Sequence, residues 1–336
     1  MTKSLPLLVL NIGSSSIKYA LFDMGNLDKI DGGKINCLPD ESEKEITSLI
    51  ERIPRPGFLA HRIVHGGDEF KHVTLLNEEI LTELEKFIPF APLHQPYNLK
   101  GVRVMAKLLP DIPQYACFDT EFHTGRSELY STFAIPLELR KKGLKRYGFH
   151  GLSYEWISGQ FDSKRLIIAH LGSGCSLCAL LDGKSVDTTM GLTALDGLPM
   201  STRSGNIDPG LVLYLIEHLK YTPDQVEHIL YRESGMKGLS GISGDFRTLQ
   251  ESDDDRAQFA LDYFILKTAQ EIARMAVSIG GIDTLVFTGG VGENSEEIRN
   301  AILDRLSFFP PFETVILPTN EEKMIALLVK AGIDYA

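Results

Sequence analysis

The chain has 336 residues, of which 43% are hydrophobic and 24% charged, as in ordinary globular proteins of two domains. Its formal net charge of −11 argues against nucleic-acid binding, which requires an excess of Lys and Arg. No apolar run approaches the roughly 20 residues of a membrane span, and the first ten residues do not resemble a secretory signal. With only four cysteines, we expect a cytoplasmic protein with reduced thiols, without a nucleic-acid or membrane partner.

Two segments share the layout of a β-hairpin with a polar tip. In the first, Leu7–Leu10 and Ile17–Asp23 predict strands joined by a turn. Residues 166–182 repeat this layout 159 positions later, where Gly172 falls on Gly13 (172 − 13). Two matching hairpins favour a duplicated domain, with chance agreement between common hairpins as the alternative.

Helices and strands alternate along the rest of the chain. Caps, prolines and hydrophobic periodicity predict helices at 77–87, 98–109, from 209, from 222, at 255–279 and from about 320. Strands are predicted at 114–119 and 283–288, and Gly289–Asn294 is predicted to turn into a helix from about Ser295. We expect an N-terminal lobe over residues 1–147 and a nucleotide-binding lobe over 148–319, with the helix of residues 320–336 joining either lobe.

Two glycine-containing turns suit phosphate groups, because hydroxyls and backbone N–H groups donate hydrogen bonds to phosphate oxygens. The first is Asn11-x-Gly13-Ser14-Ser15-Ser16-x-Lys18, which adds a cation after the turn. The second is Gly289–Asn294, which precedes a predicted helix N-terminus. A solvent-facing hairpin turn and a tight strand–helix turn are the respective alternatives.

Several charged residues stand beside these segments or at strand ends. Arg62 and Arg203 adjoin glycine-bearing stretches, and a guanidinium can bind a phosphoryl group through two parallel hydrogen bonds. Asp119 ends a predicted strand and could orient an arginine or bind a metal. Solvated surface arginines and a capping Asp are the alternatives. Cys175 and Cys178 have C-x-x-C spacing, but positions three apart in a strand face opposite sides, which argues against a metal site.

Together these segments resemble the acetate and propionate kinase family, which shares the fold of actin, Hsp70 and sugar kinases. The motifs that carry the resemblance occur in order along most of the chain: Asn11–Lys18, His61–Gly67, Ala91–Pro96, Phe118–His123, Arg146–Gly151, Val186–Gly191, Thr202–Gly205, Asp245–Arg247 and Phe287–Asn294. The resemblance implies an α/β fold of two duplicated ribonuclease-H-like domains with an active-site cleft between them. It implies reversible, direct in-line transfer of the ATP γ-phosphoryl group to acetate, with Mg²⁺ (or Mn²⁺) as cofactor, and a homodimer.

The resemblance also implies a role for each matching residue. Catalytic roles fall on Arg62, Asp119, His150 and Arg203, and the acid is expected to contact Arg62, Val64, Leu93 and Phe149. The nucleotide and its phosphates are expected at Asn11, Ser14, Ser16, Lys18, His170, Gly172, Ser173, Gly174, Asp245, Arg247, Gly289, Gly290, Gly292 and Asn294. The metal is expected at Asn11 and Glu321. Because cations stabilise the charge of a moving phosphoryl group, we expect Arg62 and Arg203 to matter for rate rather than for folding.

The chain departs from the family pattern in a few places. It is shorter than usual between Asp23 and Leu59, and Leu152, Ser173, Ala194 and Asn206 stand where the family usually carries Thr, Asn, Pro and Asp. Ala194 in place of Pro leaves more room for a longer acid. Open alternatives are therefore a propionate or longer-chain acid kinase, a pyrophosphate-dependent or sugar kinase, a nucleotide-dependent conformational protein that binds partners, and a non-catalytic relative.

Overall fold

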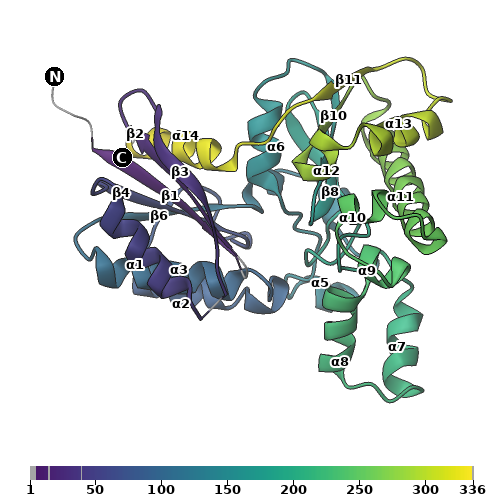
Figure 1. Ribbon diagram of the computed structural model, residues 1–336, viewed down its shortest axis with the longest axis horizontal. Helices are drawn as coiled ribbons and strands as arrows, with labels where there is room; N and C mark the ends of the chain where they lie inside the picture. Colours follow the sequence, from purple (N-terminus) through teal and green to yellow (C-terminus); the bar gives the residue numbers. More distant parts are fainter. Residues whose placement is uncertain (1–4, 14–15, 39, 335–336) are drawn as a thin grey trace. The chain divides into compact units, whose positions relative to one another are not determined.

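The computed structural model describes residues 5–13, 16–38 and 40–334, and the chain forms two compact units (Figure 1). The first unit contains the residues up to Thr124, Phe149–Trp156 and the C-terminal segment from Asn320. The second contains Gly125–Gly148 and Ile157–Thr319. The units therefore do not divide at one point in the sequence, and the C-terminal helix belongs to the first.

A six-stranded sheet forms the centre of the first unit, in the order β3-β2-β1-β4-β6-β5. β1, β4 and β6 run parallel, whereas β2, β3 and β5 each run antiparallel to their neighbours. Alternate side chains of β1 point to opposite faces: Leu8 and Leu10 enter one buried cluster, and Leu7 and Val9 enter another. The strands are β1 (Pro6–Ile12), β2 (Ser16–Asp23), β3 (Lys29–Asn36), β4 (Phe58–Ile63), β5 (Thr74–Leu75) and β6 (Gln114–Phe118).

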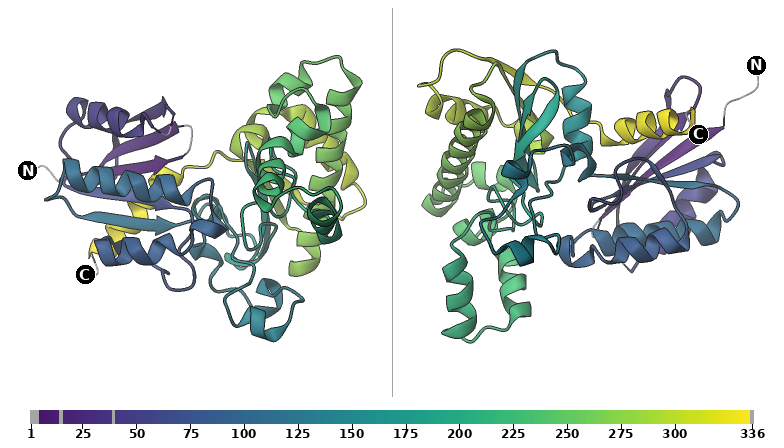
Figure 2. Two further views of the ribbon diagram at one scale, coloured as in Figure 1. Left: turned by 90° about the horizontal axis from the view of Figure 1, so that it is seen from below. Right: turned by 180° about the vertical axis from the view of Figure 1, so that it is seen from behind.

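Helices cover both faces of this sheet. α1 (Ser42–Arg52) and α3 (Gln95–Leu108) bury their apolar side chains in the Leu8 cluster, and α14 (Glu321–Asp334) packs in the Leu7 cluster (Figures 1 and 2). α3 begins three residues before its predicted start because Pro96 occupies its first turn, where a missing N–H costs nothing. The remaining helices are α2 (Glu78–Glu85), α6 (Gly151–Ser158) and the 3₁₀ turns Ile88–Phe90 and Glu121–His123.

The second unit repeats the core topology of the first. Its sheet has the order β11-β10-β7-β8-β9, with an antiparallel β7-β8-β9 meander and β10 and β11 parallel to β7. β1 and β7 are separated by 159 residues at both ends (165 − 6 and 171 − 12). The predicted duplicated α/β fold is confirmed. The strands are β7 (Arg165–Leu171), β8 (Cys175–Leu181), β9 (Lys184–Thr188), β10 (Thr284–Thr288) and β11 (Glu313–Ile316).

The long helix α11 (Asp255–Ile279) packs on β7, β8 and β9. Its predicted apolar face is buried, and Gly280 ends it in the left-handed conformation. One prediction was wrong: Gly289–Asn294 is not a turn but the short helix α12, followed by α13 (Glu296–Arg305). The other helices are α4 (Glu128–Ser131), α5 (Leu137–Arg140), α7 (Pro209–Glu217), α8 (Pro223–His228), the π-helix Ile229–Glu233, α9 (Gly235–Ser240) and α10 (Phe246–Gln250). In the described part of the chain, no helix combines the length and apolar character needed to cross a bilayer.

Candidate active site

Arg62 lies at the centre of a cluster of charged groups in the first unit. Its Nε and Nη2 donate to Asp119 at 2.9 and 2.5 Å, and its Nη1 donates to Glu321 Oε2 at 2.9 Å. Parallel pairing of β4 with β6 brings Arg62 beside Cys117, two residues before Asp119. Glu321 arrives from the start of α14, 259 residues away in sequence. The fold therefore brings together three of the predicted site residues.

The electrostatics of this cluster follow from its burial. The side chains of Arg62, Asp119 and Glu321 are only 15%, 1% and 7% exposed. Burial alone would lower the pKa of Arg62, but the two carboxylates outweigh this effect and raise it. Burial raises the pKa of Asp119, and the guanidinium opposes that shift. Arg62 is thus half of two buried ion pairs, so we expect it to contribute to the stability of the first unit as well as to the rate.

The β1–β2 hairpin places one predicted phosphate- and metal-binding residue, Asn11, against this cluster. Asn11 donates from Nδ2 to Glu321 Oε2 at 3.4 Å, and Gly13 N–H bonds the Ser16 carbonyl at 2.9 Å. Lys18 is exposed on β2 and lines a small pocket of about 190 Å³. Ser14 lies outside the described residues.

The amide oxygen of Asn11 and the carboxylate of Glu321 are hard oxygen donors of the kind that Mg²⁺ prefers. Among the described residues, no group of three or more His, Cys, Asp or Glu is placed to hold a metal. A complete protein cage is not required for Mg²⁺, which commonly uses one or two carboxylates together with substrate phosphates and waters. The donor set therefore fits a magnesium ion that arrives with a nucleotide.

Phe149 and His150 directly precede Gly151, whose backbone is hydrogen-bonded to Asp119 of the charged cluster. Gly151 N–H donates to the Asp119 carbonyl at 2.8 Å, and His123 Nε2 lies 3.0 Å from the Phe149 carbonyl. His150 has a φ of 60°, a left-handed conformation that costs a non-glycine residue roughly 1–3 kcal/mol. Such strain persists where the surroundings hold a side chain in a defined direction.

The predicted wall of the acid pocket is apolar and partly aromatic. Val64 and Phe149 are buried, and Leu93 is half-buried. His65, next to Val64, stacks on Phe87 with ring centroids 4.9 Å apart and meets Phe149 edge-on at 5.6 Å. Burial lowers the pKa of His65 to about 3, so this imidazole is neutral and adds no charge to the wall.

In the second unit, a pocket of about 640 Å³ joins the loop after β7, α10 and α12. Its volume is within the range of small-molecule sites. Its lining includes the predicted Gly172, Ser173, Asp245, Arg247, Gly290 and Asn294, together with Ser201, Phe246, Gln250, Val291 and Ser295, which sequence reasoning missed. The predicted His170, Gly174, Gly289 and Gly292 are not in this lining but lie at the end of β7, in the loop before β8 and in α12.

Asp245 in the pocket lining and Gly289, the residue before the lining residue Gly290, already have local hydrogen-bond partners. Asp245 caps α10 by accepting from Thr248 N–H at 2.9 Å. The Gly289 N–H, at the start of α12, donates to the Glu293 side chain at 2.9 Å. Asp245 is therefore a helix cap as well as a pocket residue, and the Gly289 N–H is occupied by a carboxylate of its own helix.

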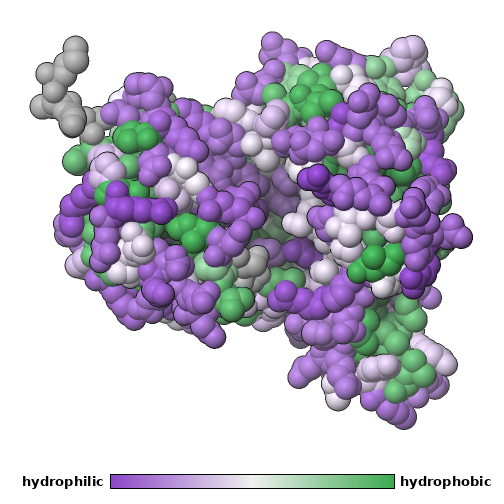
Figure 3. All heavy atoms as spheres, in the orientation of Figure 1, coloured by the Kyte–Doolittle hydropathy of each residue, from purple (hydrophilic) through white to green (hydrophobic). Residues whose placement is uncertain are grey.

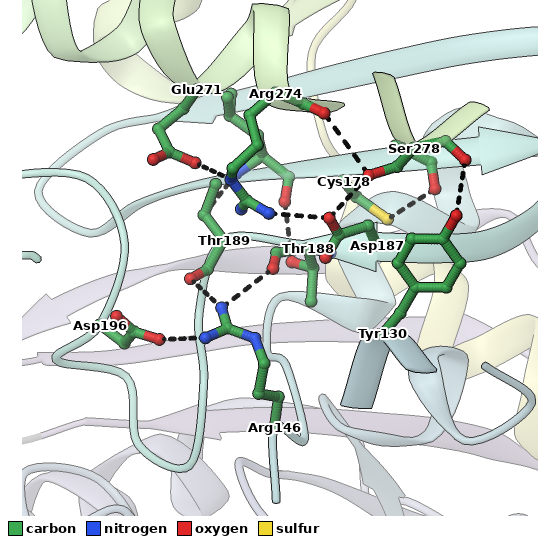
Figure 4. A network of polar contacts seen from close by, with 12 residues as sticks. Tyr130, Arg146, Cys178, Asp187, Thr188, Thr189, Asp196, Glu271, Arg274 and Ser278 are labelled. Carbon is green, nitrogen blue, oxygen red and sulfur yellow. Dashed lines mark hydrogen bonds and ion pairs between the residues drawn. The ribbon is translucent and has the colours of Figure 1, made fainter. Parts of the chain in front are cut away.

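Arg203 lies in the second unit, in a segment held by hydrogen bonds to the backbone. Its Nη1 donates to the Ala194 carbonyl at 3.0 Å, and burial lowers its pKa. The Ala194 loop is fixed by Arg146, which pairs with Asp196 at 2.8 Å and donates to the Thr189 carbonyl at 2.9 Å (Figure 4). Arg203 is therefore hydrogen-bonded to a loop that Arg146 holds in place.

The departures from the family pattern have local explanations. Leu152 is buried in the apolar cluster that includes α14. The hydroxyl of a Thr at this position would be surrounded by apolar side chains. Asn206 Oδ1 accepts from Gly197 N–H at 2.9 Å, and its Nδ2 lies 3.5 Å from Glu271. An Asp at this position would face the Glu271 carboxylate, so the amide avoids repulsion. Ser173 lines the second-unit pocket.

Comparison with known proteins identifies the family. The chain matches the acetokinase family over residues 34–310. It is 42% identical over 343 residues to an acetate kinase of Rhodopseudomonas palustris, covering 90% of this chain and 86% of that relative. The fold is similar to a propionate kinase from Francisella tularensis (TM-score 0.87, 32% identity, 96% and 98% of the two chains) and to Porphyromonas gingivalis acetate kinase (0.84, 30%, 96% and 98%). The chain belongs to the acetokinase family.

Proposed function

We propose that this protein is an acetate kinase, which transfers the γ-phosphoryl group of ATP reversibly to acetate and yields acetyl phosphate and ADP. The observation that carries this proposal is the buried arrangement of Arg62 between Asp119 and Glu321. It occurs in a chain whose second unit holds a nucleotide-sized pocket. The curated relatives named as acetate kinases support the same activity.

The chemistry requires charge neutralisation more than acid–base catalysis. A carboxylate is already nucleophilic, and the barrier comes from bringing two anions together while the phosphoryl oxygens flatten in line. Arg62, Arg203 and His150 would donate hydrogen bonds to the acid and the moving group. Mg²⁺, bound through Asn11 and Glu321, would neutralise charge on the nucleotide phosphates.

Acid selectivity is tested by measuring acyl phosphate as its hydroxamate, with ATP and acetate, propionate or butyrate. We expect the highest kcat/KM with acetate. A preference for propionate would favour the alternative of a longer-acid kinase, for which the small side chain of Ala194 and the likeness to a propionate kinase are the supporting observations. Nucleotide binding without acyl phosphate would favour a nucleotide-dependent conformational protein or a non-catalytic relative.

Gly290, which lines the proposed nucleotide pocket, allows a test of ATP binding. A Cβ at Gly290 would meet no atom within 4 Å, and Gly290 lines the pocket. We expect Gly290→Val to keep the melting temperature but to raise the KM for ATP about tenfold, a loss of about 1.4 kcal/mol, because the side chain occupies nucleotide space. Steady-state kinetics and thermal melting measure both quantities.

Gly289 provides the contrast for this experiment. It has a φ of 79°, and a Cβ there would lie 2.7 Å from the Leu171 carbonyl. Gly289→Ala should therefore lower the melting temperature through backbone strain. An unchanged KM for ATP in Gly290→Val would remove this pocket from nucleotide binding.

A homodimer and a cytoplasmic location are further parts of the proposal. α7 contributes no buried residue although it is mostly apolar, and Leu211, Leu213 and Tyr214 are 46%, 57% and 51% exposed. Apolar side chains gather over the α7–α8 hairpin in Figure 3. Exposed patches of this kind commonly mark protein interfaces. A second copy of the chain is the occupant we propose for this face.

We expect Leu213→Glu to convert a dimer into a monomer, because a carboxylate in an apolar interface loses its hydration. Light scattering after size-exclusion chromatography measures the mass. Leu129→Glu, at a site that is 80% exposed on α4, is the matched control and should leave the mass unchanged. A dimer that persists in Leu213→Glu would place the interface elsewhere.

A further inference from the structure

The chain leaves the first sheet after Arg62 through a loop whose backbone is held by side chains. β4 ends at Ile63, and the next three N–H groups bind side-chain oxygens instead of a strand. Val64 N–H donates to Asn98 Oδ1, His65 N–H to Gln95 Oε1 and Gly66 N–H to Thr120 Oγ1, each at 3.1 Å.

These acceptors are among the most buried polar groups of the unit. Asn98, Gln95 and Thr120 are 3%, 0% and 1% exposed. The Gln95 amide also donates to the carbonyls of His65 at 3.0 Å and Leu84 at 3.2 Å. A buried amide is tolerated only where it is hydrogen-bonded, so both the donor and the acceptor of Gln95 help to fix this loop.

Asn98 differs from Gln95 because it joins two separate segments. Its Nδ2 donates to the Ile12 carbonyl at 2.6 Å, immediately before Gly13 in the predicted phosphate-binding hairpin. Its Oδ1 holds Val64, the predicted wall of the acid pocket. Gly101, three residues along α3, packs so closely on Ile12 that a Cβ would lie 2.2 Å from its Cδ1.

We infer that Asn98 is a positioning residue for the phosphoryl transfer: its single amide sets the distance between the phosphate-binding hairpin and the Val64 wall of the acid pocket, and Gln95 holds the same loop. This inference rests on the proposed function, because that function assigns Val64 to the acid. A residue that only stabilised the fold would change the amount of active enzyme and leave the KM values unchanged. A positioning residue changes the KM for the acid selectively.

The test is Asn98→Asp in the full-length enzyme. At pH 8 the new carboxylate can still accept from Val64 N–H but repels the Ile12 carbonyl. The side chain then moves away from the hairpin and takes the Val64 loop with it, so we expect the KM for acetate to rise about tenfold over the native enzyme. At pH 6 the KM should return to within about threefold of native, because a buried carboxyl group tends to be protonated and its O–H then replaces the lost donor. The KM for ATP should stay within about twofold of native at both pH values.

Matched variants make the result decisive. Asn77→Asp makes the same change at an exposed helix cap in the same unit and should leave both KM values unchanged. Val64→Ala should raise the KM for acetate on its own. If Asn98→Asp does not fold, Asn98→Ser replaces it, because the shorter side chain cannot reach both Val64 N–H and the Ile12 carbonyl and predicts the same selective rise at both pH values.

Any one of three results would overturn the inference. If Val64→Ala raises the KM for acetate but Asn98→Asp or its replacement changes only kcat, the amide has no positioning role. If Val64→Ala leaves the KM for acetate unchanged, the assignment of Val64 to the acid fails, and the inference fails with it. A parallel rise in the KM values for ATP and acetate would indicate a general structural defect and would also contradict it.

Discussion

Replacement of Arg203 by alanine is expected to lower turnover by about 10³–10⁵-fold and to leave the fold intact. A guanidinium that stabilises a transferring phosphoryl group contributes an effect of that size, roughly 4–7 kcal/mol. The contacts that disappear include hydrogen bonds to two neutral groups, the Ala194 carbonyl and the Met200 sulfur. A buried acceptor that loses its donor costs about 1–3 kcal/mol. The expected loss in rate therefore exceeds the expected loss in stability.

The measurement pairs acyl phosphate formation at saturating ATP and acetate with a thermal melt. Arg55→Ala is the control, because Arg55 and its partner Asp111 are 60% and 65% exposed. Exposed pairs contribute about 0–1 kcal/mol, so this variant should keep both turnover and melting temperature. Native turnover in Arg203→Ala would exclude Arg203 from the reaction.

Local patterns in the sequence predicted most of the fold. The alternation of apolar residues along β1 and β2 and its recurrence at β7 and β8 depend on side-chain periodicity, which is visible in any sequence. The capping box at Thr222 and the left-handed Gly280 at the end of α11 are also local signals. These features were correctly located because short-range chemistry determines them.

Long-range features could not be predicted in the same way. The contact of Glu321 with Arg62 depends on α14 packing on the first sheet, and hydrophobic periodicity alone does not say which sheet a helix covers. Gln95 and Asn98 looked like ordinary polar residues at a helix start, and only tertiary structure places them against the loop after β4. α12 was read as a turn because glycine has a low helix propensity, which the Glu293 side chain offsets by binding the first N–H.

Arg62→Ala is expected to abolish most turnover and, unlike Arg203→Ala, to destabilise the first unit. The side chains of Asp119 and Glu321 are 1% and 7% exposed and both bind Arg62. Removal of one partner from a buried ion pair leaves an uncompensated charge and typically costs about 3–5 kcal/mol. We therefore expect the free energy of unfolding, measured by urea denaturation, to fall by about that amount.

A triple variant separates the structural role of Arg62 from its role in the reaction. Arg62→Met with Asp119→Asn and Glu321→Gln removes the three charges together and keeps similar side-chain volumes, so stability should largely recover. Activity should not recover, because the positive charge and the metal-binding carboxylate are both missing. If Arg62→Ala unfolded at the same urea concentration as the native enzyme, the cluster would not be a buried electrostatic unit. The role of Arg62 would then be confined to the reaction, as the sequence alone had suggested.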